Sequence, residues 1–310
     1  MPELRTAVER ARRILYEARE RRVRPGLDDK ILASWNGLML RGVAEAARAF
    51  GDAELRALAL RNGEFLIREL VRGDQVLRSY KKGVAKIAGF LEDYAAVALG
   101  ALAVYELTFD RLWLERARRL ADEILARFWD ESAHALFDTA ADTESLVTRP
   151  REVTANATPS GTSLAIELLL KLGDVLAIGA YSERGRYLLE TIAEPMARYP
   201  SAFGHALGAA DMAVRGAIEV AIAGDPRDER FASLAATVAE RYLPSLVLAG
   251  GSGPATDGIA LLEGRGGDVP TAYVCRAYAC DVPTSDVAVL GEQLEAIVAA
   301  PTASAPTSPP

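Results

Sequence analysis

One segment of the chain contains no charged residue, and a segment shortly after it contains many. Tyr94–Tyr105 contains no charged side chain, whereas Arg111–Phe128 carries Arg, Glu and Asp throughout. A helix that is apolar on all sides belongs in an interior, and a helix with one apolar stripe lies outside against it. The contrast therefore predicts a buried helix followed by a surface helix.

The same contrast recurs along the chain. A mostly apolar segment is followed by a mixed one three more times, and the last pair is the weakest: Ile31–Phe50 with Glu54–Val71, Thr162–Ala180 with Glu183–Tyr199, and Ser201–Val214 with Asp228–Tyr242. Inner and outer helices that alternate in this way predict a mainly α fold, a toroid of α/α hairpins.

The remaining segments add a helix without a partner and a few short strands. Glu3–Arg22 reads as an outer-type helix with no inner helix before it, so we expect a toroid that is incomplete on its N-terminal side. Alternation and turn residues predict a hairpin at Val71–Tyr80 and strands at Ala135–Thr139, Glu219–Ala223, Leu246–Ala249 and Thr271–Cys280. We expect one domain over residues 1–298 and a disordered Pro/Ser/Thr/Ala tail over 299–310.

Composition excludes several classes of function. The net charge of −7 argues against a nucleic-acid surface, and no apolar run reaches the ~20 residues of a membrane span. Two cysteines and the absence of a signal-peptide pattern favour a reducing cytoplasm. Cys275 and Cys280 would lie on opposite faces of one strand, so a local disulfide would need a bend, and a structural role is favoured for both. His134 and His205 read as incidental, and no metal or cofactor is expected.

Polar residues gather where the inner helices are expected to begin. Loops held by a rigid scaffold commonly carry binding and catalytic groups. The candidate residues fall at three such starts and on one neighbouring segment: Asp28, Asp29, Lys30, Trp35 and Asn36; Glu92, Asp93 and Tyr94; Ser160; and Arg78 with Tyr80. If the starts meet at one end of the toroid, these side chains share one cup.

Each candidate also has an ordinary structural interpretation. Asp28 fits a helix cap better than a catalyst, and Ser160 fits a cap as well. Asp29, Glu92 and Asp93 can complement the positive end of a helix. Trp35 alone fits a core position, and Arg78–Lys82 is either a clamp for an anion or hydroxyl or a solvated turn, with the turn favoured.

The convergence of carboxylates, an amide and aromatic rings favours a sugar site. Sugar binding uses carboxylates for acid–base chemistry and hydroxyl bonding, together with flat rings against the pyranose. Asp29 and Glu92 are the preferred catalytic pair, but the sequence gives no distance between them.

Four motifs resemble those of the spermatogenesis-associated protein 20-like family of thioredoxin-domain-containing proteins. They are Arg24–Met39 (RPGLDDKILASWNGLM), Gly89–Ala95 (GFLEDYA), Ala157–Ser163 (ATPSGTS) and Thr271–Cys275 (TAYVC) with Cys280 and Pro283. The likeness runs from about Glu3 to Glu292, and the first motif is the longest and most specific.

The resemblance implies an (α/α)6 toroid of the six-hairpin glycosidase type, similar in shape to N-acylglucosamine 2-epimerases. Family members carry a thioredoxin-like domain and further hairpins ahead of this region. We therefore expect a carbohydrate-active or carbohydrate-binding toroid, of glycoside hydrolase or sugar isomerase/epimerase type if it is an enzyme. The alternative is a non-catalytic scaffold that pairs with a thioredoxin-like domain, or with the missing barrel half, supplied as a separate chain.

Overall fold

A computed structural model describes residues 2–144, 147–276 and 279–299. Its contacts divide the chain into two compact units, Met1–Lys30 and Ile31–Pro310, and each is described by itself. The first unit is helix α1 (Pro2–Glu20) followed by residues without regular strand or helix, which confirms the helix expected there. The expected disordered tail lies outside the described residues, except that Ala299 ends the last helix.

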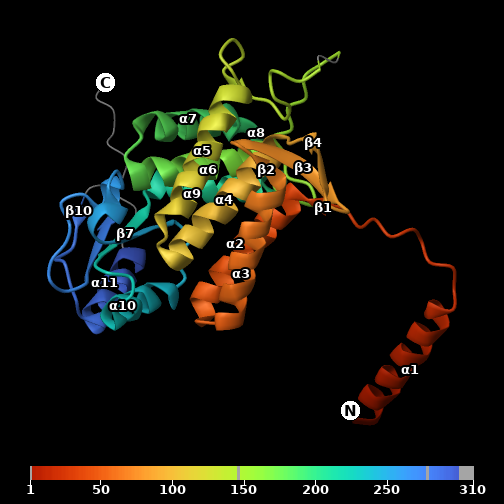
Figure 1. Cartoon of the computed structure of the whole chain (residues 1–310), viewed down its shortest axis with the longest axis horizontal. Coiled ribbons are helices and arrows are strands. Elements are labelled where there is room, and N and C mark those ends of the chain that lie inside the picture. The colour runs from red at the N-terminus through yellow and green to blue at the C-terminus, as the bar shows by residue number, and fades with distance from the viewer. Residues whose placement is uncertain (1, 145–146, 277–278, 300–310) are drawn as a thin grey trace. The chain divides into compact units, whose positions relative to one another are not determined.

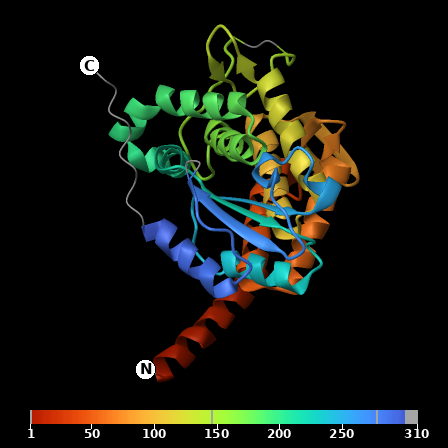
Figure 2. The same ribbon diagram turned by 90° about the vertical axis from the view of Figure 1, so that its left-hand side faces the viewer.

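The second unit is built on helical hairpins, as the charge contrast predicted. The paired helices are α2 (Ala33–Phe50) with α3 (Ala53–Leu70), α4 (Leu91–Thr108) with α5 (Arg111–Arg127), and α6 (Gly161–Leu176) with α7 (Gly179–Thr191). The first helices of the pairs pack against one another, α2 on α4 and α4 on α6. Figures 1 and 2 show the pairs following one another in an arc. The unit is thus mainly α, a partial toroid of α/α hairpins.

Burial separates the inner helices from the outer ones. Every residue of α4 from Asp93 to Glu106 is buried, while α5 buries only a stripe that includes Trp113, Leu120 and Ile124. This stripe has the three-to-four-residue spacing of an amphipathic helix. None of the helices among the described residues is long and apolar enough to cross a bilayer.

A small antiparallel sheet borders the starts of α2 and α4. It comprises β1 (Ile31–Leu32), β2 (Val71–Arg72), β3 (Gln75–Lys81) and β4 (Val84–Ala88), and each of the other three strands pairs with β3. The β2–β3 hairpin was predicted. The favoured solvated turn at Arg78–Lys82 is wrong, because residues up to Lys81 pair with β4 and are held in the sheet.

Besides the pair α6 and α7, the chain between α5 and β7 contains several short elements and one longer helix. These are β5 (Trp129–Asp130), β6 (Ala135–Leu136), α8 (Ala193–Arg198), the 3-10 turn η1 (Pro200–Ala202) and α9 (Gly204–Arg215). Helix α9 packs against α6 and α7 and so continues the inner layer.

The C-terminal part is an α/β layer. Its elements are β7 (Ile218–Ala223), α10 (Glu229–Ala239), β8 (Leu246–Gly251), the 3-10 turns η2 (Gly253–Thr256) and η3 (Ala260–Leu262), β9 (Thr271–Arg276), β10 (Ala279–Cys280) and α11 (Val287–Ala299). The strand order is β10-β9-β7-β8, with β7 and β8 parallel.

The fourth helical pair was therefore predicted wrongly. Between its two helices runs β7, and α10 is the crossover that joins the parallel strands β7 and β8. A parallel pair needs such a crossover, and a strand buried on both faces reads as an almost continuous apolar run. Helix α10 packs against α11 and the sheet, whereas α9 stays with α6.

The single strand expected over Thr271–Cys280 is also wrong. The chain reverses after Arg276, so β10 pairs antiparallel with β9 and Cys280 lies directly opposite Cys275. The two sulfurs form a disulfide. The reversal supplies the bend that a local bridge between these two residues requires.

Candidate functional site

The starts of the three inner helices meet. The backbone N–H of Ser34, in the first turn of α2, donates to Asp93 Oδ1 of α4 over 3.0 Å. A methyl group added at Gly161, the first residue of α6, would lie 2.8 Å from the backbone nitrogen of Glu92. The first turns of α2, α4 and α6 are therefore in contact at one end of the helical layer.

A cavity of about 460 Å³ opens at the starts of α4 and α6. Three of the residues proposed from sequence line it, namely Arg78, Glu92 and Ser160. Further lining comes from the insertion after β6, above all Asp138 and Glu152. The cavity thus combines a cation, three carboxyl groups and a helix start.

Arg78 holds the acidic groups of α4 in place. Its Nη1 donates to Glu92 Oε1 over 2.8 Å and to Asp93 Oδ2 over 2.9 Å. Its guanidinium group also stands over the ring of Phe90, 4.4 Å from the ring centroid. Strand β3 positions this side chain, so Arg78 is a fixed part of the cavity wall.

Asp93 and Tyr94 are buried residues of α4 next to the site. Asp93 is fully buried and accepts hydrogen bonds from the backbone N–H groups of Ser34 and Phe90. Burial raises its pKa, although the bond from Phe90 and the charge of Arg78 oppose the shift. Tyr94 is also buried, and its hydroxyl accepts from Arg127. Neither residue is among the described residues that line the cavity.

Asp138 and Glu152 were not found by sequence reasoning. The insertion that carries them read as polar loops, and nothing in its spacing shows that it folds onto α4. One backbone contact joins it to α4, since Leu91 N–H donates to the carbonyl of Asp138, and a second bond within the insertion, from Glu152 N–H to the Asp138 carboxylate over 2.8 Å, holds the two acids together. Burial raises the pKa of Asp138, and the negative charges of Glu152 and Glu92 add to the increase.

The other proposed residues lie outside this cavity. Trp35 is 62% exposed on α2, Asn36 Nδ2 donates to the carbonyl of Leu32, and Tyr80 packs edge-on against Phe65. Asp28, Asp29 and Lys30 belong to the first unit, where Asp28 accepts a bond from Lys30 N–H. Because the two units are described separately, the pairing of Asp29 with Glu92 stays a prediction.

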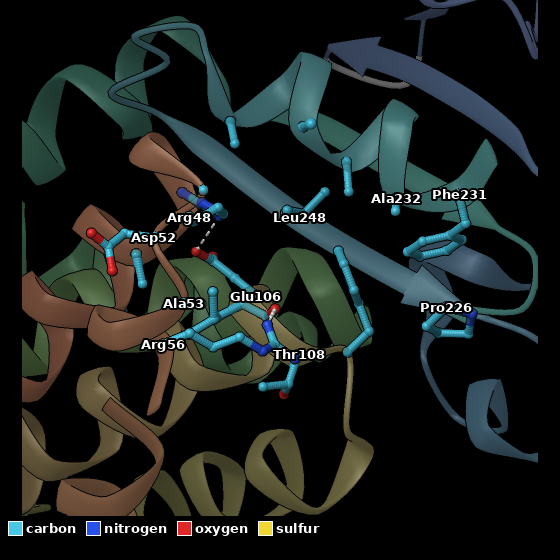
Figure 3. Close-up of a pocket in the computed structure, with 17 residues that line it drawn as sticks. Arg48, Asp52, Ala53, Arg56, Glu106, Thr108, Pro226, Phe231, Ala232 and Leu248 are labelled. Carbon is cyan, nitrogen blue, oxygen red and sulfur yellow. Dashed lines mark hydrogen bonds and ion pairs between the residues drawn. The ribbon is translucent and has the colours of Figure 1, made fainter. Parts of the chain in front are cut away.

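A second cavity, of about 390 Å³, lies at the opposite ends of α2 and α4 (Figure 3). One wall is apolar and includes Phe231, Ala232 and Leu248. Its charged groups already have protein partners, since Arg48 pairs with Glu106 at 3.0 Å and Arg56 donates to the carbonyl of Leu107. The first cavity offers more carboxylates, and we therefore place the candidate site there.

A buried charge network crosses the inner helices between the two cavities. Arg41 of α2 donates both terminal nitrogens to Glu167 of α6, and His205 Nε2 of α9 lies 2.9 Å from Glu167 Oε2. His205, interpreted as incidental from sequence, thus ties α9 to α6. Among the described residues no group of three or more His, Cys, Asp or Glu side chains could hold a metal ion.

Solved structures with related arrangements cover about half of the chain. A GH76 alpha-mannanase from Bacteroides thetaiotaomicron is 18% identical, with a TM-score of 0.44, over 55% of this chain and 47% of that one. A sugar epimerase from a ruminal bacterium is 17% identical, with a TM-score of 0.43, over 53% and 44%. Likeness at this level carries no conclusion about activity.

The sequence relatives extend much further along the chain. No protein-family model matches it. Human spermatogenesis-associated protein 20 is 31% identical over 293 residues, and the rat protein of the same name is 30% identical over 293 residues. Each alignment covers 88% of this chain but 37% of the relative, so the chain spans little more than a third of those proteins. Over the shared segment, this chain is similar in sequence to the spermatogenesis-associated protein 20 relatives, in agreement with the resemblance of its motifs.

Proposed function

We propose that the cavity at the starts of α4 and α6 binds a sugar ring or a glycan. The observation that carries the proposal is the set of charged groups that line the cavity of about 460 Å³: Arg78, Glu92, Asp138 and Glu152. Carboxylates and a fixed guanidinium group are well suited to the hydroxyl groups of a sugar, which both donate and accept hydrogen bonds.

Two carboxyl groups in this cavity differ in their surroundings. Glu92 Oε1 accepts a hydrogen bond from the guanidinium group of Arg78. Asp138 has a raised pKa and keeps its proton to higher pH than an ordinary aspartate. Glycosidic acid–base chemistry uses two carboxyl groups that flank the scissile bond. In a catalytic form of this proposal Asp138 is a candidate proton donor, and the pairing of Asp29 with Glu92 proposed from sequence stays a separate proposal.

Binding of mono- and oligosaccharides, followed by calorimetry on the whole chain, tests this proposal. We expect Glu92→Gln and Asp138→Asn each to weaken binding of a sugar ligand about tenfold or more, since a hydrogen bond to a charged group contributes ~1.5–3 kcal/mol. Glu144→Gln is the matched control, because Glu144 is an exposed acid of the same insertion that is not among the described residues lining this cavity.

Thermal unfolding of each variant would show that the fold is retained. Sugar binding that is unaffected by both substitutions would refute the site. Failure of all sugars to bind would favour the alternative, a non-catalytic scaffold that pairs with a thioredoxin-like domain from another chain. A cytoplasmic location is part of the same proposal and is tested by fractionation of cells that express the chain.

A further inference from the structure

The only two cysteines of the chain form one bridge at the edge of the C-terminal sheet. Cys275 of β9 is 1% exposed, whereas Cys280 on the edge strand β10 is exposed. An external thiolate can therefore reach the sulfur of Cys280 more easily than that of Cys275. The two sulfurs of the bridge therefore differ in accessibility. We expect an external thiolate to attack Cys280 Sγ and Cys275 Sγ to be the leaving group.

A guanidinium group stands beside both sulfurs. Arg265 Nη2 lies 3.4 Å from Cys275 Sγ and 3.8 Å from Cys280 Sγ. The Arg265 group is held over the ring of Tyr273, 4.9 Å from the ring centroid. Its Nη1 is buried and has no hydrogen-bond partner among the described residues. A cation in this position stabilises a thiolate and lowers the pKa of the thiol.

Glu219 lies at the same register position of the sheet as the two cysteines. Glu219 of β7 is directly opposite Cys275, which is directly opposite Cys280. Residues opposite one another in antiparallel strands have side chains on the same face, so the side chains of Glu219 and Cys275 project from the same face of the sheet. Burial raises the pKa of Glu219 while the charge of Arg265 opposes the increase.

The other charged groups near this register position come from α6 and β9. Burial and the charge of Glu219 raise the pKa of Asp174 on α6 to about 6, and Arg186 opposes this shift. Arg276, next to Cys275 on β9, interacts with Arg215 and Asp211 instead. The cation at the bridge is thus Arg265, and two carboxyl groups with raised pKa values, those of Glu219 and Asp174, interact with each other nearby on β7 and α6.

We propose that Cys275–Cys280 is a thiol–disulfide exchange site for a dithiol reductant. In this exchange Arg265 stabilises the thiolate of the leaving Cys275, and Glu219 exchanges a proton with that thiolate. A thiolate of the dithiol attacks Cys280 Sγ and forms a mixed disulfide. The bond between the protein sulfurs breaks, and its electron pair goes to Cys275 Sγ, which leaves as a thiolate beside Arg265.

The second thiolate of the dithiol then attacks its own sulfur in the mixed disulfide and releases Cys280. The reductant becomes a disulfide, and the two protons that its thiols lose are taken up by Cys280, from solvent, and by Cys275, through Glu219. The bridge closes a loop of about five residues, so its loop-entropy contribution to stability is smaller than that of a bridge across a long loop.

Reduction of the folded full-length chain by dithiothreitol at neutral pH tests the proposal. Free thiols are counted over time by alkylation and mass spectrometry. Arg265→Gln is expected to slow reduction on the order of tenfold, because the leaving thiolate loses its stabilising charge, whereas Arg265→Lys retains most of the rate. Arg276→Gln is the matched control, since Arg276 is adjacent to Cys275 in sequence but interacts with Arg215 and Asp211. Equal rates for wild type and Arg265→Gln would overturn the proposal.

Two further measurements separate exchange from a loss of folding. In Cys280→Ser, absorbance of the thiolate near 240 nm titrates Cys275, and Arg265→Gln in this background should raise the pKa of the thiol. The monothiol glutathione should form its mixed disulfide on Cys280, which peptide mapping identifies. Glutathione mainly on Cys275, or a bridge that is reduced only after urea unfolding, would contradict the proposed direction of attack. None of these results depends on whether the chain binds sugar.

Discussion

Replacement of Glu167 by glutamine is expected to lower the free energy of unfolding by about 3–5 kcal/mol, the usual cost of removing one partner from a buried ion pair. Only 12% of the Glu167 side chain is exposed, and both of its oxygens accept from Arg41, over 2.7 and 2.8 Å. Lys171 Nζ lies 3.7 Å away on the same helix. Without the carboxylate, the positive charges of Arg41 and Lys171 remain buried with less negative charge near them.

The effect should depend on pH. Burial by itself would raise the pKa of Glu167, but the contact with His205 and the charges of Arg41 and Lys171 outweigh it and hold the pKa far below the ordinary value of 4.5. A depressed pKa in the folded state gives stability that is fully present above the unfolded pKa and is lost progressively as the pH falls toward and through the folded pKa. The difference between wild type and Glu167→Gln should therefore be largest above about pH 5 and shrink in acid.

Urea denaturation at pH 7 and pH 4 measures both expectations. Glu45→Gln is a matched control, because Glu45 Oε1 accepts from the same Arg41 over 2.8 Å but its side chain is 43% exposed. Exposed pairs contribute ~0–1 kcal/mol, so this variant should remain close to wild type. Similar losses for the two variants would show that burial of the network contributes nothing.

Substitution of Gly37 by alanine should destabilise the chain by about 3 kcal/mol, at the upper end of overpacking costs. A Cβ atom at this position would lie 2.5 Å from the carbonyl carbon of Ala96 and 2.7 Å from the backbone nitrogen of Val97. Backbone atoms of a buried helix cannot move aside as a flexible side chain can. Helices α2 and α4 would have to separate, and both pack along the centre of the helical layer.

Gly42→Ala, on the same helix, is the control for Gly37→Ala. A Cβ atom at Gly42 meets nothing within 4 Å. Because alanine is the better helix former, this variant should gain about 0.5–1 kcal/mol. Chemical denaturation of both variants gives the comparison. A Gly37→Ala protein as stable as wild type would mean that the two helices are less closely packed than the structure shows.

The alternation of apolar and charged helices was readable from the sequence because burial acts locally on composition. Tyr94–Tyr105 has no charge, and the structure buries that whole stretch in α4. Asp110, by contrast, marks the start of the surface helix α5 by accepting from Leu112 N–H. Patterns of this kind depend on residues that are close in sequence, so the sequence alone reveals them.

The pattern was misleading where pairing partners lie far apart in sequence. Ser201–Val214 and Asp228–Tyr242 look like a further hairpin, yet β7 separates them, and its partner β8 begins only after α10. Likewise, Thr271–Cys280 has the composition of one strand, and only the pairing of Cys280 with Cys275 shows that the chain reverses. Strand pairing depends on contacts that local propensity does not encode.

The first three pairs of inner and outer helices could be predicted from sequence, and so could Glu92 and Ser160, because the starts of α4 and α6 carry local polar signals; Arg78 was named from the polar segment before α4. The tertiary structure alone decided that the insertion places Asp138 and Glu152 on the same cavity, and that Arg265 and Glu219 flank Cys275. Those groups meet through backbone pairing and burial between distant segments, and such contacts leave no spacing that can be read along the chain.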